Sequence, residues 1–561
     1  MRSMPVRWRQ LIEPWRLMPR KDAPLPLWMI FPVIFAALYA SHFQLMRVPY
    51  YWDEAGYYIP AAWDFFRTGS LIPLTTLTNA HPPLPSIYLA LWWRLSGFDL
   101  EVTREAVLIV ASVGLLAVWR LALRINGSSI NGSSAVGSSA VALWTVVLTA
   151  AYPIWFAQST LAHADIFAAA CTLWGLVYSL PDRNRRPWVA AVWFSAAALC
   201  KETSIAIPLA LAMISTVAAV RAMPPVRWRL MREAMAQAAC LLPLAAWYVY
   251  HFAKTGFIFG NPEFLRYNAQ ATLDPLRIVA AFGHRLLHLT AHMNLFVPVL
   301  CAMGALFFSS QLDAEGHTRS GISRSVQTKI FVLLAADAAV FSVLGGALLT
   351  RYLLPMYPLI CLLAVSTFYR RVRYWQGVAA FSLAAFGLAL FVNPPYGFAP
   401  EDNLTYAQVV RQHVLGAAQL QSAAKDGTAL TVLTAWPGSD ELTRPELGYV
   451  QRPLAVYRLE DFSDSEIARA AADGTKYSAA LVFSTKYDPP VPIFSLGPFS
   501  KKLDERYFGL HHDESPEVIA SKLGGIVTWK REEQGMWTAV IRFDRPAAEK
   551  GTAAGWQVPR R

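Results

Sequence analysis

Apolar runs alternate with short polar segments up to about residue 400, and most runs approach the ~20 residues that cross a bilayer as a helix. The remaining chain lacks such runs. The pattern predicts a mostly α-helical, polytopic membrane bundle over residues 27–395 with about 11 spans. The runs lie at 27–46, 105–123, 138–156, 165–180, 188–200, 203–220, 234–252, 287–309, 330–349, 352–369 and 376–393.

The segment LPSIYLALWWRLS at 84–96 is apolar but short for a span, and if it crossed the membrane every later loop would change sides. Cytoplasmic loops carry an excess of Lys and Arg. The Arg-rich loops at 183–186, 221–232 and 370–373 are cytoplasmic only if 84–96 does not cross. We therefore expect a basic cytoplasmic N-terminus at 1–26 and an outer loop at 47–104. In that loop, 84–96 forms a helix along the outer surface.

From about residue 400 the pattern changes to short apolar strands and Gly-terminated helices. Strands are predicted at 428–436, 477–485 and 535–543, and helices at 464–474 and 515–525. We therefore expect an extracytoplasmic α/β domain at 400–561, following the membrane bundle.

Composition supports the membrane assignment, because only 16% of residues are charged and 55% are hydrophobic, whereas soluble domains carry about 25% charged residues. The net charge of +12 does not predict a nucleic-acid partner, since the Arg clusters fall between apolar runs where they face anionic lipid. We expect an integral multi-pass protein of a bacterial inner (plasma) membrane, with membrane lipids around it. The five cysteines lie in or beside apolar runs, so the predicted C-terminal domain has no disulfide framework; they are Cys171, Cys200, Cys240, Cys301 and Cys361.

Two adjacent acids, Asp53 and Glu54, follow the first apolar run within YYWDEAGYY at 50–58. Carboxylates among aromatic residues near a membrane are costly unless they have partners or a function. Neighbouring side chains point in different directions, so one carboxylate can face a substrate while the other holds the loop or a cation. A solvated acidic turn is the alternative.

Further polar residues lie at the predicted outer ends of later runs. His81 lies in NAHPPLP at 79–85, His163 and Asp165 lie in the second outer loop, and Lys201 and Arg351 each lie at an outer edge. Each also has a purely structural interpretation: His81 as a packing residue, Asp165 as a favourable charge at a helix N-terminus, Lys201 as a partner of Glu202 or a snorkelling side chain. Arg351 departs from the positive-inside pattern, which a local anion explains most simply.

Taken in order, the Asp-Glu pair after the first span, the His-Pro-Pro-Leu entry to a surface helix and the later outer motifs resemble the GT-C superfamily of membrane glycosyltransferases. More narrowly they look like the protein O-mannosyltransferase-like and aminoarabinose-transferase-like enzymes, over about the first 390 residues. The resemblance implies transfer with inversion of a sugar from a polyprenyl-phosphate donor to a hydroxyl of a protein, lipid or glycan. It also implies a further acid in the second outer loop and no general need for a metal.

The chemistry assigns a role to each candidate. Asp53 is the expected base for the acceptor hydroxyl. Glu54 and Asp165 are expected to orient Asp53 or the sugar, or to bind a divalent cation. Lys201, Arg351 and His81 are expected to bind the donor phosphate, because positive charge on the departing oxygens favours their release. The expected substrate and lipid groove consists of Trp52, Tyr57, Tyr58 and His163.

A transporter or flippase of lipid-linked saccharides is the alternative function. Transporters place polar or broken helices near the bilayer midplane. Here the ionisable residues gather at the predicted outer edge, which favours chemistry at the membrane surface.

Overall fold

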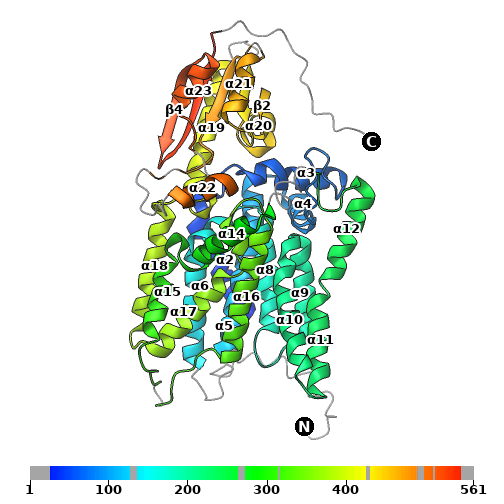
Figure 1. Cartoon of the computed structure of the whole chain (residues 1–561), viewed down its shortest axis with the longest axis vertical. Coiled ribbons are helices and arrows are strands. Elements are labelled where there is room, and N and C mark those ends of the chain that lie inside the picture. Colours follow the sequence, from blue (N-terminus) through cyan, green and yellow to red (C-terminus); the bar gives the residue numbers. More distant parts are fainter. Residues whose placement is uncertain are drawn as a thin grey trace, which may run out of the picture.

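The computed structural model describes residues 26–126, 135–262, 272–313, 316–424, 430–474, 476–487, 489, 498–509 and 512–544. The basic N-terminus predicted at 1–26 lies outside the described residues, except for Pro26. The chain forms a large helical bundle with a small α/β domain at one end (Figure 1). The fold is therefore mostly α-helical with one small sheet, as the sequence predicts.

Helices occupy every predicted apolar run, although several begin or end away from the predicted limits. The bundle helices are α2 (Leu27–His42), α5 (Leu100–Asn126), α6 (Ala135–Ala151), α7 (Pro153–Gln158), α8 (Ala164–Ser179), α9 (Pro187–Cys200), α10 (Ala206–Val220), α11 (Val226–Ala238), α12 (Leu241–Thr255), α14 (Pro275–Thr290), α15 (Phe296–Ala305), α16 (Arg324–Val343), α17 (Tyr357–Arg371) and α18 (Trp375–Phe391).

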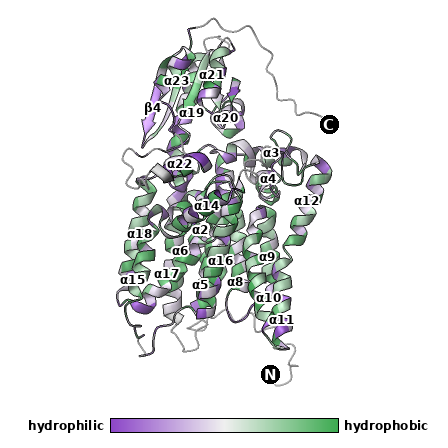
Figure 2. Ribbon diagram, viewed as in Figure 1, coloured by the Kyte–Doolittle hydropathy of each residue, from purple (hydrophilic) through white to green (hydrophobic). Residues whose placement is uncertain are grey.

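Within the described residues, four helical segments have the length and hydropathy to cross a membrane by themselves: Leu27–Leu45, Leu100–Asn126, Glu202–Val220 and Arg324–Val343. Four shorter apolar helices accompany them. Figure 2 shows apolar residues along the bundle helices and hydrophilic residues on β4 and α22 of the C-terminal domain. These helices mark an integral membrane protein, and the number of about 11 spans stays a prediction.

The run at 287–309 is not the single straight span that its hydropathy predicts. It contains the end of α14, the short helix η6 (His292–Asn294) and α15, and the chain bends by 95° there. Met293 and Asn294 have φ of 47° and 62°, in the left-handed region that an α-helix of L-residues does not enter. The two segments together still have the length and hydropathy of one bent span, so the span at 287–309 stays a prediction. The sequence gives no sign of the break, because neither residue is a glycine or a proline.

The C-terminal domain contains a five-stranded sheet in the order β2-β1-β3-β5-β4. Strands β2 (Ala455–Leu459), β1 (Thr431–Ala435) and β3 (Ala479–Phe483) are parallel, and β5 (Met536–Arg542) and β4 (Ile526–Glu533) are antiparallel to their neighbours. Residues of α21 (Asp464–Ala472) and α23 (Pro516–Leu523) pack with one set of strand side chains. The long helix α19 (Thr405–Ala424) packs with the alternate set, including Val432 and Leu481. The sheet is therefore covered on both faces.

Short helices of the loop 47–104 lie at the bundle end that faces the C-terminal domain (Figure 1). They are η3 (Glu54–Tyr58), one turn of π-helix, then α3 (Ile59–Thr68) and α4 (Leu84–Ser96). Helix α4 coincides with the segment predicted to lie along the membrane surface. It buries Leu89 and Trp93 and leaves Leu91 and Leu95 exposed, as a helix with two different faces should.

Candidate active site

A cavity of about 2430 Å³ lies where the bundle, the loop 47–104 and the C-terminal domain meet. Its walls are largely apolar, with side chains such as Leu209 and Leu244 from one group of helices and Leu388 from another. Polar side chains from distant parts of the sequence also line it, including Asp53, His81, Lys201, Arg351 and Glu401. A cavity of this size, apolar with a few convergent polar groups, is the main candidate for a ligand site.

Arg351 is the centre of a cluster of charges on this cavity. Its guanidinium pairs with Asp53, donates to Glu401 Oε2 at 2.8 Å, and lies 3.4 Å from Asp165 Oδ2. Asp165 also pairs with Lys201, whose ammonium lies 3.9 Å from the ring centre of Tyr352. The structure thus brings the predicted base and two predicted phosphate ligands together, with two cations facing three carboxylates.

Helix ends place these charged groups. Lys201 lies just after α9, where the backbone is extended at φ −150°, and η4 (Glu202–Ile205) follows it. Asp165 lies in the first turn of α8, where a negative charge is favourable. Arg351 lies in the short helix η7 (Thr350–Leu353), between α16 and α17. Charged residues at breaks between apolar helices therefore meet in one cluster, of which Lys201 and Arg351 line the cavity.

Two residues with positive φ each directly precede a polar residue that lines the cavity. Trp52 precedes Asp53 with φ 46°, and Ala80 precedes His81 with φ 60°. Non-glycine residues are uncommon in this region and are concentrated at functional sites, where the surrounding structure holds them. This geometry supports a functional assignment for Asp53 and His81.

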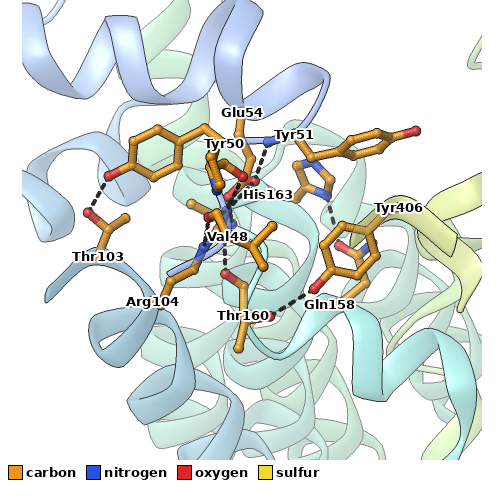
Figure 3. A network of polar contacts seen from close by, with 12 residues as sticks. Val48, Tyr50, Tyr51, Glu54, Thr103, Arg104, Gln158, Thr160, His163 and Tyr406 are labelled. Carbon is orange, nitrogen blue, oxygen red and sulfur yellow. Dashed lines mark hydrogen bonds and ion pairs between the residues drawn. The ribbon is translucent and has the colours of Figure 1, made fainter. Parts of the chain in front are cut away.

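Glu54 lies behind the cavity and does not line it. Its carboxylate is fully buried and accepts hydrogen bonds from Arg104 Nη1 at 2.5 Å and Nη2 at 3.1 Å, and from the backbone N–H groups of Tyr51 and Ala162 at 2.9 and 2.5 Å (Figure 3). Arg104 also donates to the carbonyls of Val48, Pro49 and Thr160. Glu54 therefore fixes the loop that carries Asp53, the second of the two uses expected for adjacent acids.

The predicted aromatic groove is only partly on the cavity surface. Trp52, Tyr57 and Tyr58 line the cavity, and the Tyr58 ring stacks on His81 with a centroid separation of 6.0 Å. His81 Nδ1 lies 2.9 Å from Glu202 Oε2.

His163 is fully buried beneath this surface. Its Nδ1 lies 2.9 Å from Gln158 Oε1 and 3.1 Å from Arg351 Nη1. Burial, followed by the positive charges of Arg351, Arg104 and Lys201, holds the pKa of His163 well below its usual value. His163 and Asp165 thus support the site from behind rather than line it.

Sequence reasoning did not identify Glu401 and Asp402. Both lie in η8 (Pro400–Asp402), which follows α18. Glu401 contacts Arg351, while Asp402 pairs with Thr350 and lies 2.9 Å from His292. The signal was present, because two adjacent acids follow the last apolar run just as Asp53 and Glu54 follow the first.

The C-terminal domain also contributes side chains that the sequence did not reveal. Trp436 contacts the edge of the Trp52 ring, with centroids 5.2 Å apart, and lines the cavity. Lys486 donates to the carbonyl of Gly509, and burial lowers the pKa of its ammonium. From the bundle, His284 and His292 of the α14–η6 segment also line the cavity, and His284 lies 3.2 Å from Asp504 of α22 (Pro498–Tyr507).

No group of three or more His, Cys, Asp or Glu side chains in the described part of the chain is placed to hold a metal ion. Asp53, Asp165 and Glu401 are instead grouped around Arg351. All five cysteines are free thiols.

Comparison with protein-family models finds no match, and comparison with curated proteins finds none either. Among solved structures, ArnT from Cupriavidus metallidurans in the apo state is similar, with a TM-score of 0.49 and 14% identity over 91% of this chain and 97% of that one. The same protein bound to undecaprenyl phosphate aligns over the same shares, with a TM-score of 0.48 and 14% identity.

Proposed function

We propose that the protein is an inverting glycosyltransferase that moves a sugar from a polyprenyl-phosphate donor to a hydroxyl of a protein, lipid or glycan at the outer membrane face. The observation that carries this proposal is the meeting of Asp53, Lys201 and Arg351 on one large, mainly apolar cavity. Apolar walls suit a polyprenyl chain, and the two cations suit the phosphate at its end.

The donor phosphate has to enter a cluster whose cations already hold carboxylates. Lys201 pairs with Asp165, and Arg351 pairs with Asp53. A phosphate oxygen that binds Arg351 competes with Asp53 for the same guanidinium N–H groups. Donor binding therefore loosens Asp53 from its ion pair at the moment when a base is needed.

Asp53 is the best placed of the three acids around Arg351 to reach a substrate. Its side chain is 31% exposed, whereas those of Asp165 and Glu401 are 3% and 5% exposed. In the proposed step, the acceptor oxygen forms a bond to the anomeric carbon while its proton passes to Asp53. The bond from the anomeric carbon to the phosphate oxygen breaks, and its electron pair stays on the phosphate beside Lys201 and Arg351.

The other predicted residues have supporting roles in this proposal. Glu54 fixes the loop of Asp53 through Arg104, and Asp165 holds Lys201. His81, Tyr57 and Tyr58 form a wall beside the phosphate subsite, where flat rings can contact the sugar. A divalent cation at the acids remains a hypothesis that addition of a chelator tests directly.

The break between α14 and α15 favours the second candidate function, a transporter or flippase for lipid-linked saccharides. Transporters build substrate sites from broken helices, and here a 95° bend occurs beside His292, which lines the cavity. The two functions differ in one measurable way. A transferase works in detergent solution, where no membrane separates two compartments, whereas transport does not exist there.

The test is a transfer assay with purified protein in detergent and a panel of polyprenyl-phosphate sugars, with release of polyprenyl phosphate as the readout. Mass spectrometry of surface glycans from cells with and without the gene identifies the sugar and acceptor. We expect Asp53→Asn to fold normally and to lower turnover by about 10²–10⁴-fold, the usual contribution of a general base. Wild-type turnover by Asp53→Asn would exclude Asp53 as the base, and no release from any donor would favour the transporter.

A further inference from the structure

Glu401 occupies an unusual position for an acid on a ligand cavity. Its Oε2 accepts a hydrogen bond from Arg351 Nη1, while its Oε1 is buried and has no hydrogen-bond partner in the described part of the chain. An ionised oxygen without a partner is costly in a buried site, and a neutral carboxyl is much less so. The geometry therefore favours a protonated Glu401, whose carbonyl oxygen still accepts a hydrogen bond from Arg351.

The charge balance of the cluster leads to the same conclusion. Lys201 and Arg351 supply two positive charges, and their partners Asp165 and Asp53 supply two negative ones. Ionised Glu401 would add a third negative charge close to where the donor phosphate binds. Neutral Glu401 leaves the cluster balanced before the phosphate enters.

We propose that Glu401 is a positioning residue: as a neutral carboxylic acid, it keeps the Arg351 guanidinium in place when Asp53 exchanges Arg351 for the acceptor hydroxyl. The inference rests on the proposed transferase function. Asp53 and Glu401 contact different guanidinium nitrogens, Nη2 and Nη1. Glu401 therefore retains its contact after Asp53 has left, and Arg351 stays directed at the phosphate.

The groups around Glu401 determine how the cluster responds to pH. Arg351 faces it from η7, Asp53 and Tyr51 from the loop after α2, Asp165 from α8, and Asp402 from its own short helix. Burial is the largest influence and raises the pKa of Glu401 to about 8, opposed by Arg351. The pKa of Tyr51 is held well above 10 by burial, so its phenol stays neutral in the same range.

Ionisation of Glu401 should weaken donor binding at high pH. Below about pH 8 Glu401 is neutral, and above it the acid ionises and repels the donor phosphate. The donor is a phosphodiester and carries the same charge throughout this range. The KM for the donor should therefore rise with pH above 8, toward about tenfold per pH unit if only the neutral form binds donor.

The experiment measures kcat and donor KM between about pH 6 and pH 9.5 for wild type, Glu401→Gln and Glu401→Ala, with Glu532→Gln as a control on strand β4. Glutamine is a neutral isostere whose amide oxygen can accept a hydrogen bond from Arg351. The donor KM of Glu401→Gln should therefore stay constant over the pH range in which the donor KM of the wild type rises. Alanine lets Arg351 shift, and kcat should fall by about 100-fold, the cost of a misplaced catalytic group. Glu401→Gln should recover most of that loss, and Glu532→Gln should follow the wild-type curve.

Each other outcome has a definite meaning. Equal alkaline rises in wild type and Glu401→Gln would show that Glu401 is not the titrating group and would overturn the inference alone. A loss of kcat in Glu401→Gln as large as in Glu401→Ala would show that the ionised carboxylate is required, which also overturns it. If wild type neither transfers sugar nor binds undecaprenyl phosphate, the proposed function fails and the inference fails with it. Trp52 and Trp436 line the cavity, so tryptophan fluorescence can report that binding.

Discussion

At the residue scale, the neighbouring acids Asp53 and Glu54 have opposite surroundings. Asp53 is partly exposed on the cavity, whereas Glu54 is fully buried and held by Arg104 and two backbone N–H groups. Although the two residues are adjacent in sequence, one carboxylate lies on the cavity and the other lies beneath it. The two positions should therefore respond differently to mutation, Asp53 through activity and Glu54 through stability.

Removal of Arg104 should destabilise the protein strongly. Arg104→Ala leaves the Glu54 charge buried without its cation, a change that typically costs about 3–5 kcal/mol. Arg47→Ala is the matched control, because the Arg47–Glu101 pair belongs to the same loop–α5 junction but the Arg47 side chain is 83% exposed, and such pairs contribute about 0–1 kcal/mol. Thermal unfolding in detergent measures both. Equal melting temperatures for the two variants would show that the buried pair does not hold the loop.

At the element scale, the sequence predicted best those features that depend on a single helix end. Asp53, His81, Lys201 and Arg351, which all line the cavity, were singled out because a polar residue at the edge of an apolar run needs an explanation. Glu401 showed the same signal and was passed over. Which of Asp53 and Glu54 faces the cavity could not be predicted, because Arg104, the partner that decides it, lies 50 residues further along the chain.

Contacts between elements far apart in sequence were beyond sequence reasoning altogether. Trp436 precedes α20 (Gly438–Thr443) of the C-terminal domain and packs on η3, the turn that follows Asp53. The indole is so close that a Cβ added to Gly56 would lie 2.5 Å from Trp436 Nε1. No local sequence pattern at Gly56 or Trp436 predicts this contact.

Gly56→Ala should therefore push the C-terminal domain away from the Asp53 turn. The added methyl overlaps the indole and should cost about 1–3 kcal/mol of stability, as overpacking does, with a loss of transfer activity. Gly377→Ala changes a helical glycine in α18, where the new Cβ meets no atom of the described residues within 4 Å. That control should be neutral or slightly stabilising.

A double-mutant cycle with Trp436→Ala identifies the cause of any loss in Gly56→Ala. If the indole is responsible, Gly56→Ala should have little further effect once Trp436 is truncated. Additive losses in stability and activity would instead place the effect of Gly56→Ala somewhere other than this contact.

At the scale of the whole molecule, the C-terminal domain lies at one end of the helical bundle (Figure 1). Its residues Trp436, Lys486 and Asp504 line the cavity, which therefore lies at the same end. The domain is tied to the loop 47–104 by hydrogen bonds from Arg444 to the Thr75 carbonyl at 2.6 Å and from Tyr449 to the Tyr50 carbonyl at 2.9 Å. Whichever side of the membrane holds the C-terminal domain therefore also holds the cavity. The distribution of arginines predicts that this is the outer side.

Cysteine labelling in intact cells tests this orientation. On a background in which the five native cysteines are replaced, Lys476→Cys should react with a membrane-impermeant maleimide, because the Lys476 side chain is 59% exposed on the C-terminal domain. Arg227→Cys, exposed in the first turn of the Arg-rich helix α11, should react only after the membrane is permeabilised. The reverse pattern would place the cavity in the cytoplasm. Lipid-linked sugars presented on the outer face could then not reach Asp53, and transfer would have to use donors and acceptors of the inner leaflet.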